Sequence, residues 1–320
     1  MLYQDTVDTV AANAVKKAEF LNRHPLGYLL ASILAGAYIG LGIILIYSIG
    51  APLAAASDPS KQALMGASFA IALSLVIIAG AELFTGNNMT MVCGSWMKKT
   101  TLNQLMGIWI TSWLGNLIGS VALAAIVWSS GAAIVKADAF VTSTALAKVS
   151  APFWALFWRA VLCNWLVCLA VWCSARASSE AGKLVMIFWC LFAFIGSGFE
   201  HSVANMTLLS LAMFMPHPDG LTWTACAYNV GVVTLGNIVG GSLFVAGSYC
   251  YASRSPIREA VGLTARESRT GHDHPAGGSR ACANHSRANQ RRRGQLQCPD
   301  TCLRGTGICK KPARTDARRA

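Results

Sequence analysis

Six long apolar runs, separated by short polar segments, occupy most of the first 251 residues of the chain. The runs cover approximately residues 26–49, 66–96, 104–128, 153–175, 184–215 and 225–251. A helix that crosses a lipid bilayer needs about 20 consecutive apolar residues, and each run is long enough. The pattern therefore predicts an all-α membrane protein with six transmembrane helices.

The second and fifth runs are interrupted near their middle by polar residues and glycines. Residues 82–89 read Glu-Leu-Phe-Thr-Gly-Asn-Asn-Met, and residues 196–206 read Gly-Ser-Gly-Phe-Glu-His-Ser-Val-Ala-Asn-Met. Irregular backbone at membrane depth is tolerated only where it is buried in protein or lines an aqueous cavity. We therefore expect helices 2 and 5 to be broken by pore loops, and the two breaks to meet around a lumen.

The two halves of the apolar region resemble each other. Leu-Gly-Asn occurs at 114–116 in the third run and at 235–237 in the sixth, and Glu82 and Glu200 lie at matching places. Residues 26–128 thus correspond to residues 153–251, and three spans per half force the halves to insert with opposite orientation. Broken helices at matching places in inverted repeats indicate a transport site, and their positive N-terminal ends favour an anion.

The first 25 residues contain an apolar stripe at helical spacing. The stripe consists of Tyr3, Val7, Val10, Ala14, Ala18 and Leu21. It predicts an amphipathic helix in the segment 1–25, lying either on the membrane surface or as a soluble cap over the protein. The first apolar run is too long for a signal peptide, so we expect it to be a span.

Charge is distributed unevenly along the chain. Only 12% of the 320 residues are charged and 54% are hydrophobic, whereas a soluble domain has about 25% charged residues. Residues 252–320 hold 15 Lys/Arg and 5 Asp/Glu, a net charge of +10, while residues 1–251 hold 11 and 9, a net charge of +2. Lys and Arg are more frequent in the loops on the N-terminal side of the membrane, which predicts that both termini are cytoplasmic.

The basic tail, residues 252–320, lacks apolar periodicity, and its composition predicts disorder. Its cysteines and histidines could ligate zinc, although their spacing fits no standard site, and its arginines could contact anionic lipid. These residues are Cys298, Cys302, Cys309, His272, His274, His285 and Arg291 to Arg293. We expect neither a metal nor a cofactor and no nucleic-acid partner. A translated out-of-frame extension would have a similar composition.

Ionisable residues inside the apolar runs are candidates for function, because a charge at membrane depth is costly. His201 is the one histidine within the six runs, and it can bond an anion or lend it a proton. A buried packing histidine is the alternative. We expect Glu82 and Glu200 to accept hydrogen bonds from unpaired backbone N–H groups at the breaks, with a proton relay as the alternative.

Two asparagines and two glycines accompany these residues. Asn116 and Asn237 each follow a glycine in the repeated Leu-Gly-Asn motif. We expect Asn116 to join helices and Asn237 to face the lumen. Gly86 and Gly198 are expected to serve a structural role at the two breaks.

Three motifs are similar to those of the formate/nitrite transporter family, over approximately residues 1–251. They are Ala-Glu-Leu-Phe-Thr-Gly at 81–86, Cys-Asn-Trp-Leu-Val-Cys-Leu-Ala at 163–170 and Ser-Gly-Phe-Glu-His-Ser-Val-Ala-Asn-Met at 197–206. The resemblance implies an aquaporin-like protomer in a homopentamer, each protomer with its own pore, in a bacterial inner membrane. It also implies passage of a small monovalent anion, with nitrite preferred and formate or hydrosulfide as alternatives.

The resemblance also assigns roles to single residues. His201 is similar to the central pore histidine, Thr85 to the threonine on the loop of the second helix, and Asn205 to the asparagine after the histidine. Lys148 resembles the lysine of the outer vestibule, which attracts anions. The residues that resemble the apolar constrictions on either side of the histidine are Leu83, Phe84, Phe69, Leu73 and Phe194.

Other classes of function are less well supported by the residues. The apolar runs contain neither a Ser/His pair nor a His-Glu-x-x-His motif, so an enzyme is not expected. A membrane scaffold that binds a partner through the basic tail is the remote alternative. If His201 lends a proton to the anion, passage depends on pH.

Overall fold

The computed structural model describes residues 3–253, and every regular element in this part of the chain is helical. The expectations for the tail, including the zinc ligands and the arginines, fall almost entirely outside the described residues. The α-helices are α1 (Gln4–Arg23), α2 (Pro25–Ala55), α3 (Lys61–Ser68), α4 (Ala70–Ser74), α5 (Phe84–Trp96), α6 (Leu102–Ser130), α7 (Asp138–Val149), α8 (Phe153–Arg176), α9 (Glu180–Gly196), α10 (Ser202–Phe214), α11 (Trp223–Val239) and α12 (Ser248–Ala252).

Three further helical segments link these helices. They are the π-helices η1 (Leu75–Gly80) and η3 (Gly240–Gly247) and the 3-10 helix η2 (Ala133–Ala137). Within residues 3–253, five helical stretches are long and apolar enough to cross a membrane. They are Pro25–Ala55, Lys61–Gly80, Leu102–Ser130, Phe153–Arg176 and Trp223–Ala252. The expected all-helical, membrane-spanning architecture is therefore confirmed in its main features.

Local sequence signals set several helix boundaries. Pro25 occupies the first turn of α2, where its missing N–H costs no hydrogen bond. Thr101 caps α6 through a capping box with Gln104. At the other end of α6, Gly131 adopts a left-handed conformation with φ of 62° that terminates the helix.

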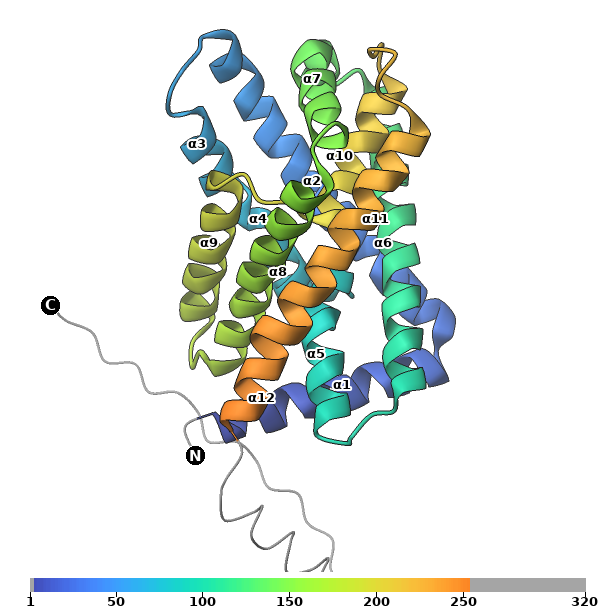
Figure 1. The fold of residues 1–320 in the computed structure, drawn as a ribbon, viewed down its shortest axis with the longest axis vertical. Helices are drawn as coiled ribbons and strands as arrows, with labels where there is room; N and C mark the ends of the chain where they lie inside the picture. Colours follow the sequence, from blue (N-terminus) through green and yellow to red (C-terminus); the bar gives the residue numbers. More distant parts are fainter. Residues whose placement is uncertain (1–2, 254–320) are drawn as a thin grey trace, which may run out of the picture. The chain divides into compact units, whose positions relative to one another are not determined.

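In each half of the chain, the first long helix packs on the last, as α2 does on α6 and α8 on α11 (Figure 1). Glycines allow the backbones to approach closely. A Cβ at Gly36 would collide with the carbonyl of Asn116, and one at Gly236 would collide with the carbonyl of Phe157. Small residues at such crossings are typical of helix packing in membranes.

Helix α1 lies across the ends of α5, α6 and α12 (Figure 1). Its apolar face is buried, and Val7 and Val10 pack in one cluster with Cys93 and Trp172. The N-terminal amphipathic helix thus directs its apolar face into protein contacts. Of the two positions considered for this segment, the geometry resembles a cap over the helix ends.

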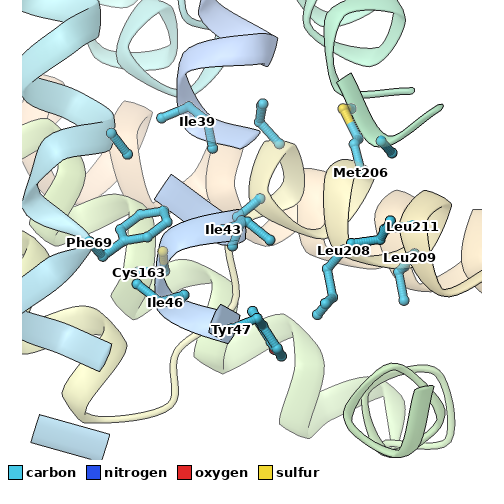
Figure 2. Packing of buried hydrophobic residues seen from close by; sticks show 14 of the residues in the cluster. Ile39, Ile43, Ile46, Tyr47, Phe69, Cys163, Met206, Leu208, Leu209 and Leu211 are labelled. Carbon is cyan, nitrogen blue, oxygen red and sulfur yellow. The ribbon is translucent and has the colours of Figure 1, made fainter. Parts of the chain in front are cut away.

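The largest apolar cluster joins α2, α4, α8, α9 and α10 and surrounds the two helix breaks. Figure 2 shows part of it, with side chains from α2 and α10 and the ring of Phe69. Phe69 packs on α2 at Gly42, where a Cβ would meet its ring at 3.1 Å. This packing fixes the position of an aromatic side chain next to the site described below.

Candidate functional site

The backbone leaves the helical conformation at two places in the middle of the bundle. The first break, residues 81–83, separates η1 from α5, and the second, residues 197–201, separates α9 from α10. A left-handed glycine lies in or just before each break, Gly80 with φ of 83° and Gly198 with φ of 70°. Glycine adopts this conformation without steric penalty, so the chain can turn sharply at both places before the next helix begins.

Each break is held by one buried asparagine from the last long helix of its half. Asn116 accepts from the Phe84 N–H at 2.9 Å and donates to the Glu82 carbonyl at 3.0 Å. Asn237 accepts from the Ser202 N–H at 2.9 Å and donates to the Glu200 carbonyl at 3.0 Å. Both side chains are fully buried. They satisfy backbone groups that have no helical partner.

This arrangement differs from the expectation for Asn237, Glu82 and Glu200. Asn237 was expected to face the lumen, but its amide joins helices as that of Asn116 does, since its Nδ2 also donates to the Ala160 carbonyl at 2.8 Å. The carboxylates of Glu82 and Glu200 accept from side chains and not from the loose backbone N–H groups.

The Glu200 carboxylate is the centre of a buried polar cluster. Lys148 Nζ donates to both of its oxygens at 2.8 Å, and Asn205 Nδ2 donates to Oε2 at 2.7 Å. Asn205 Nδ2 also lies 2.8 Å from Asn229 Oδ1, and Asn229 Nδ2 donates to the Lys148 carbonyl. Charge-assisted bonds of this kind are about twice as strong as neutral ones. The lysine and glutamate are therefore held in one geometry.

The Glu82 carboxylate has a matching environment. It accepts from Lys17 Nζ on α1 and from the Tyr28 hydroxyl at 2.8 Å, with Asn87 Nδ2 at 3.4 Å. Asn87, five residues after Glu82, thus corresponds to Asn205, five residues after Glu200. The sequence analysis assigned no role in the site to Asn87 or to Lys17. A match at equal spacing from each glutamate would have found Asn87.

His201 is the last residue of the second break and is 3% exposed. It forms the N-cap of α10, where Nδ1 accepts the Ala204 N–H at 3.1 Å. Nε2 lies 2.9 Å from Thr85 Oγ1, which comes from the first turn of α5. Because Nδ1 is an acceptor, the neutral ring carries its proton on Nε2 and donates toward Thr85. The structure thus brings together His201 and Thr85, which are 116 residues apart.

A small chamber of about 10 Å³ adjoins the His201 ring. Its lining includes four of the five predicted constriction residues, and it also includes three residues that sequence reasoning missed. The four are Phe69, Leu73, Leu83 and Phe194, and the three are Ile39, Val167 and Leu191. The rings of Phe69 and Phe194 meet edge to face at 5.4 Å. A void of this size holds about one water molecule.

Two of the predicted residues lie elsewhere. Phe84 does not line the chamber and packs its ring against Trp109 at 6.4 Å. Gly86 lies within α5, where an added Cβ would meet only Val171, at 3.7 Å. The glycine that matches Gly198 in conformation is Gly80. Its signal in the sequence was its place before the motif at 81–86.

Larger cavities adjoin each of the two breaks. One cavity of about 490 Å³ is lined by Lys17 and Glu82 and reaches Leu73 and Leu83, which also line the chamber. The other, of about 310 Å³, is lined by Lys148 and Glu200. Within residues 3–253, no group of three His, Cys, Asp or Glu side chains is placed to hold a metal ion. The arrangement is a small, mostly apolar chamber beside a histidine, with two larger cavities that are each lined in part by a paired lysine and glutamate.

The chain belongs to the formate/nitrite transporter family, whose model matches residues 4–251. This confirms the resemblance seen in the three sequence motifs. The chain is 46% identical to the nitrite transporter NirC of Salmonella typhimurium, over 81% of this chain and 95% of the relative. It is 40% identical to a probable formate transporter of Methanothermobacter thermautotrophicus, over 78% of this chain and 97% of the relative.

Solved structures agree with this assignment. The fold matches an FNT family ion channel with a TM-score of 0.74 and 45% identity, over 79% of this chain and 100% of that chain. It also matches a pentameric formate channel with formate bound, with a TM-score of 0.62 and 28% identity. That second match covers 70% of this chain and 95% of the other.

Proposed function

We propose that this protein is a membrane channel for small monovalent anions and that nitrite is its main substrate. The observation that carries the proposal is the His201–Thr85 pair, buried beside a narrow chamber between two helix breaks with a polar cavity adjoining each. Membership of the family and 46% identity to a nitrite transporter support the choice of anion. Formate is the second candidate, because a probable formate transporter is 40% identical.

The architecture that we propose has six spans in two inverted halves, residues 26–128 and 153–251, with an aquaporin-like arrangement. The second span then comprises Lys61–Gly80 and α5, and the fifth comprises α9 and α10. We propose that five protomers assemble in a bacterial inner membrane, each with its own pore, and that both termini are cytoplasmic. The match to a pentameric channel and the Lys/Arg distribution support these points.

In this proposal an anion enters one vestibule and loses most of its water at the apolar side chains of the constriction. The chamber holds about one water molecule, so the side chains of Phe69, Leu73, Leu83 or Phe194 move during passage. The anion then takes the Nε2–H of His201 and the hydroxyl of Thr85 as donors. These two donors replace part of the hydration shell, whose loss is otherwise costly.

The hydrogen bonds of His201 restrict how it can lend a proton. A second ring proton would lie on Nδ1, which accepts the Ala204 N–H at 3.1 Å. Charging the ring therefore breaks the cap of α10, which costs about 1 kcal/mol or more. We propose that neutral His201 acts as a hydrogen-bond donor, and that proton lending occurs only in a state where this bond is open.

Anion flux in proteoliposomes tests the proposal. The full-length protein is reconstituted, and the uptake of nitrite, formate, hydrosulfide and chloride is measured at equal concentration. We expect nitrite to pass fastest, formate and hydrosulfide more slowly and chloride least. Uptake of none of the four above that of empty liposomes would contradict the channel assignment. Formate passing faster than nitrite would contradict only the choice of nitrite.

A further inference from the structure

The cavity next to Glu200 carries more positive charge than the Lys148–Glu200 pair accounts for. Its lining includes Lys61, Lys148, Arg159 and Glu200. Three cations and one carboxylate give this cavity a net charge of +2. We call it the outer vestibule, because the proposed topology places it on the outer side of the membrane.

Lys148 contributes little to this net charge as seen by an incoming anion. Its Nζ lies 2.8 Å from both oxygens of the Glu200 carboxylate, which is 4% exposed. Two opposite unit charges at this distance form a dipole whose field falls off quickly. The excess charge of the vestibule therefore belongs to Lys61 and Arg159.

Lys61 and Arg159 have no carboxylate within 4.0 Å in the part of the chain that the structure describes. Asp58, three residues before Lys61, directs its Oδ1 to the N–H and the hydroxyl of Ser60 at 2.8 and 2.6 Å. Both cations are thus available to an anion.

Neighbouring groups position the Lys61 side chain and the Arg159 backbone beside the vestibule. Lys61 Nζ lies over the ring of Phe140, 5.6 Å from its centroid, which is a cation–π geometry. The Phe140 ring in turn packs on Tyr47 at 5.4 Å. The Arg159 carbonyl accepts the Glu200 N–H at 3.3 Å, so Arg159 is joined to the second helix break.

We infer that Lys61 and Arg159 form a recruiting site for small oxyanions at the outer vestibule, an inference that rests on the proposed channel function. A guanidinium binds two oxygens of one anion in parallel, as nitrite and formate allow and chloride does not. A cavity of one charge sign with low-dielectric walls raises the local concentration of an oppositely charged substrate. The site acts before the constriction and sets how readily anions enter.

The other vestibule provides an internal comparison. Its lining includes Lys16, Lys17 and Glu82, a net charge of +1, and Lys17 is paired with Glu82. One cation, Lys16, remains in excess there, against two in the outer vestibule. The inference therefore predicts that anion entry depends more strongly on charge from the outer side than from the inner side.

The test measures initial nitrite uptake into right-side-out and inside-out membrane vesicles that contain the full-length protein. The variant is Lys61→Gln with Arg159→Gln, and Lys61→Arg with Arg159→Lys retains the charges. Lys136→Gln is the matched control, since Lys136 lies on the same side but lines a different cavity. Uptake is compared at about 0.01 M and about 1 M potassium gluconate, where the screening length falls from about 30 Å to about 3 Å.

We expect the neutral double variant to lose about tenfold in uptake at low nitrite and low salt, in right-side-out vesicles only. The loss should disappear at high salt and at saturating nitrite, and neither the charge-retaining variant nor Lys136→Gln should show it. Equal uptake by the double variant and the wild type would overturn the inference and leave the channel function intact. An equal loss in Lys136→Gln would also overturn it, because a general surface charge would then suffice. Absence of nitrite uptake by the wild type would instead contradict the proposed function, and the inference with it.

Discussion

The ring of His201 uses both of its nitrogens. Nδ1 accepts from the backbone of α10 at 3.1 Å, and Nε2 lies 2.9 Å from the hydroxyl of Thr85 on α5. One residue thereby caps the start of α10 and presents a donor to the first turn of α5, which follows the other break. A histidine that only filled space would not need a hydrogen bond at either ring nitrogen, since a packing role requires no particular tautomer.

Asn116 and Asn237 give a prediction at the residue scale. Replacing either by Ala removes an acceptor and leaves the N–H of Phe84 or Ser202 buried without its partner, which costs about 1–3 kcal/mol. We expect Asn116→Ala and Asn237→Ala to lower the thermal unfolding temperature of the purified protein by similar amounts. Asn103→Ala, on the exposed surface of α6, should change it little. If Asn237→Ala unfolds like the wild type yet passes no nitrite, Asn237 faces the lumen, and the interpretation that it only holds the backbone of the second break is wrong.

The residues of the candidate site could be found from the sequence where they belong to a compact motif. The motifs at 81–86 and 197–206 located Thr85, Glu82, Glu200 and His201 in one place. Contacts between residues on different helices could not be predicted from these motifs. Lys17 reaches Glu82 only because α1 folds back over the bundle, and Phe84 turns to Trp109 because the first turn of α5 rotates it out of the chamber.

At the scale of elements, the breaks depend on how the chain leaves each preceding helix. Gly80 ends η1 with positive φ, and Gly198 has positive φ two residues after the end of α9. Sequence reasoning identified Gly198 but chose Gly86 in the other half, because Gly86 lies inside the polar motif. Positive φ is required before an extended segment and not within a helix, so the position before the motif is the decisive one.

Three glycines form a matched set for testing the breaks. A Cβ at Gly80, Gly198 or Gly131 would meet nothing within 4 Å, so an alanine adds only the strain of positive φ, about 1–2 kcal/mol. We expect each Ala variant to be destabilised to a similar degree, as measured by thermal unfolding. Nitrite flux should fall in Gly80→Ala and Gly198→Ala, while Gly131→Ala, at the end of α6, should keep it. Equal flux in all three would show that the break geometry does not govern passage.

Within the described part of the molecule, α2 packs on α6 in the same way as α8 packs on α11. This repeated packing places Asn116 and Asn237 at matching positions, and likewise the paired carboxylates of Glu82 and Glu200. The all-helical fold with several apolar spans could be predicted, because length and hydrophobic content alone decide whether a segment can span a membrane, and five stretches of the described residues meet that criterion. The packing of α1 could not, because an amphipathic stripe fits a lipid surface and a protein surface equally well.

The basic tail gives a prediction at the scale of the whole chain. The family model ends at residue 251, and every residue of the candidate site precedes it. We expect removal of residues 256–320 to leave nitrite flux in proteoliposomes within about twofold of the full-length value, once the amounts of inserted protein are matched. A truncated protein that inserts normally and passes no nitrite would make the tail part of the transport mechanism.

The central claim is that the anion passes beside His201, and nitrite flux through His201 variants in proteoliposomes tests it most directly. His201→Phe keeps the ring volume and removes both hydrogen bonds, while His201→Asn keeps an oxygen that can cap α10 and a side-chain donor. Losing a hydrogen bond to a charged substrate costs about 1.5–3 kcal/mol, or about ten- to a hundredfold in rate. We predict that loss in His201→Phe, with partial recovery and a flatter pH dependence in His201→Asn, while Phe84→Leu, outside the chamber, stays near the wild type. Equal nitrite flux through wild type and a folded His201→Phe variant would contradict the account.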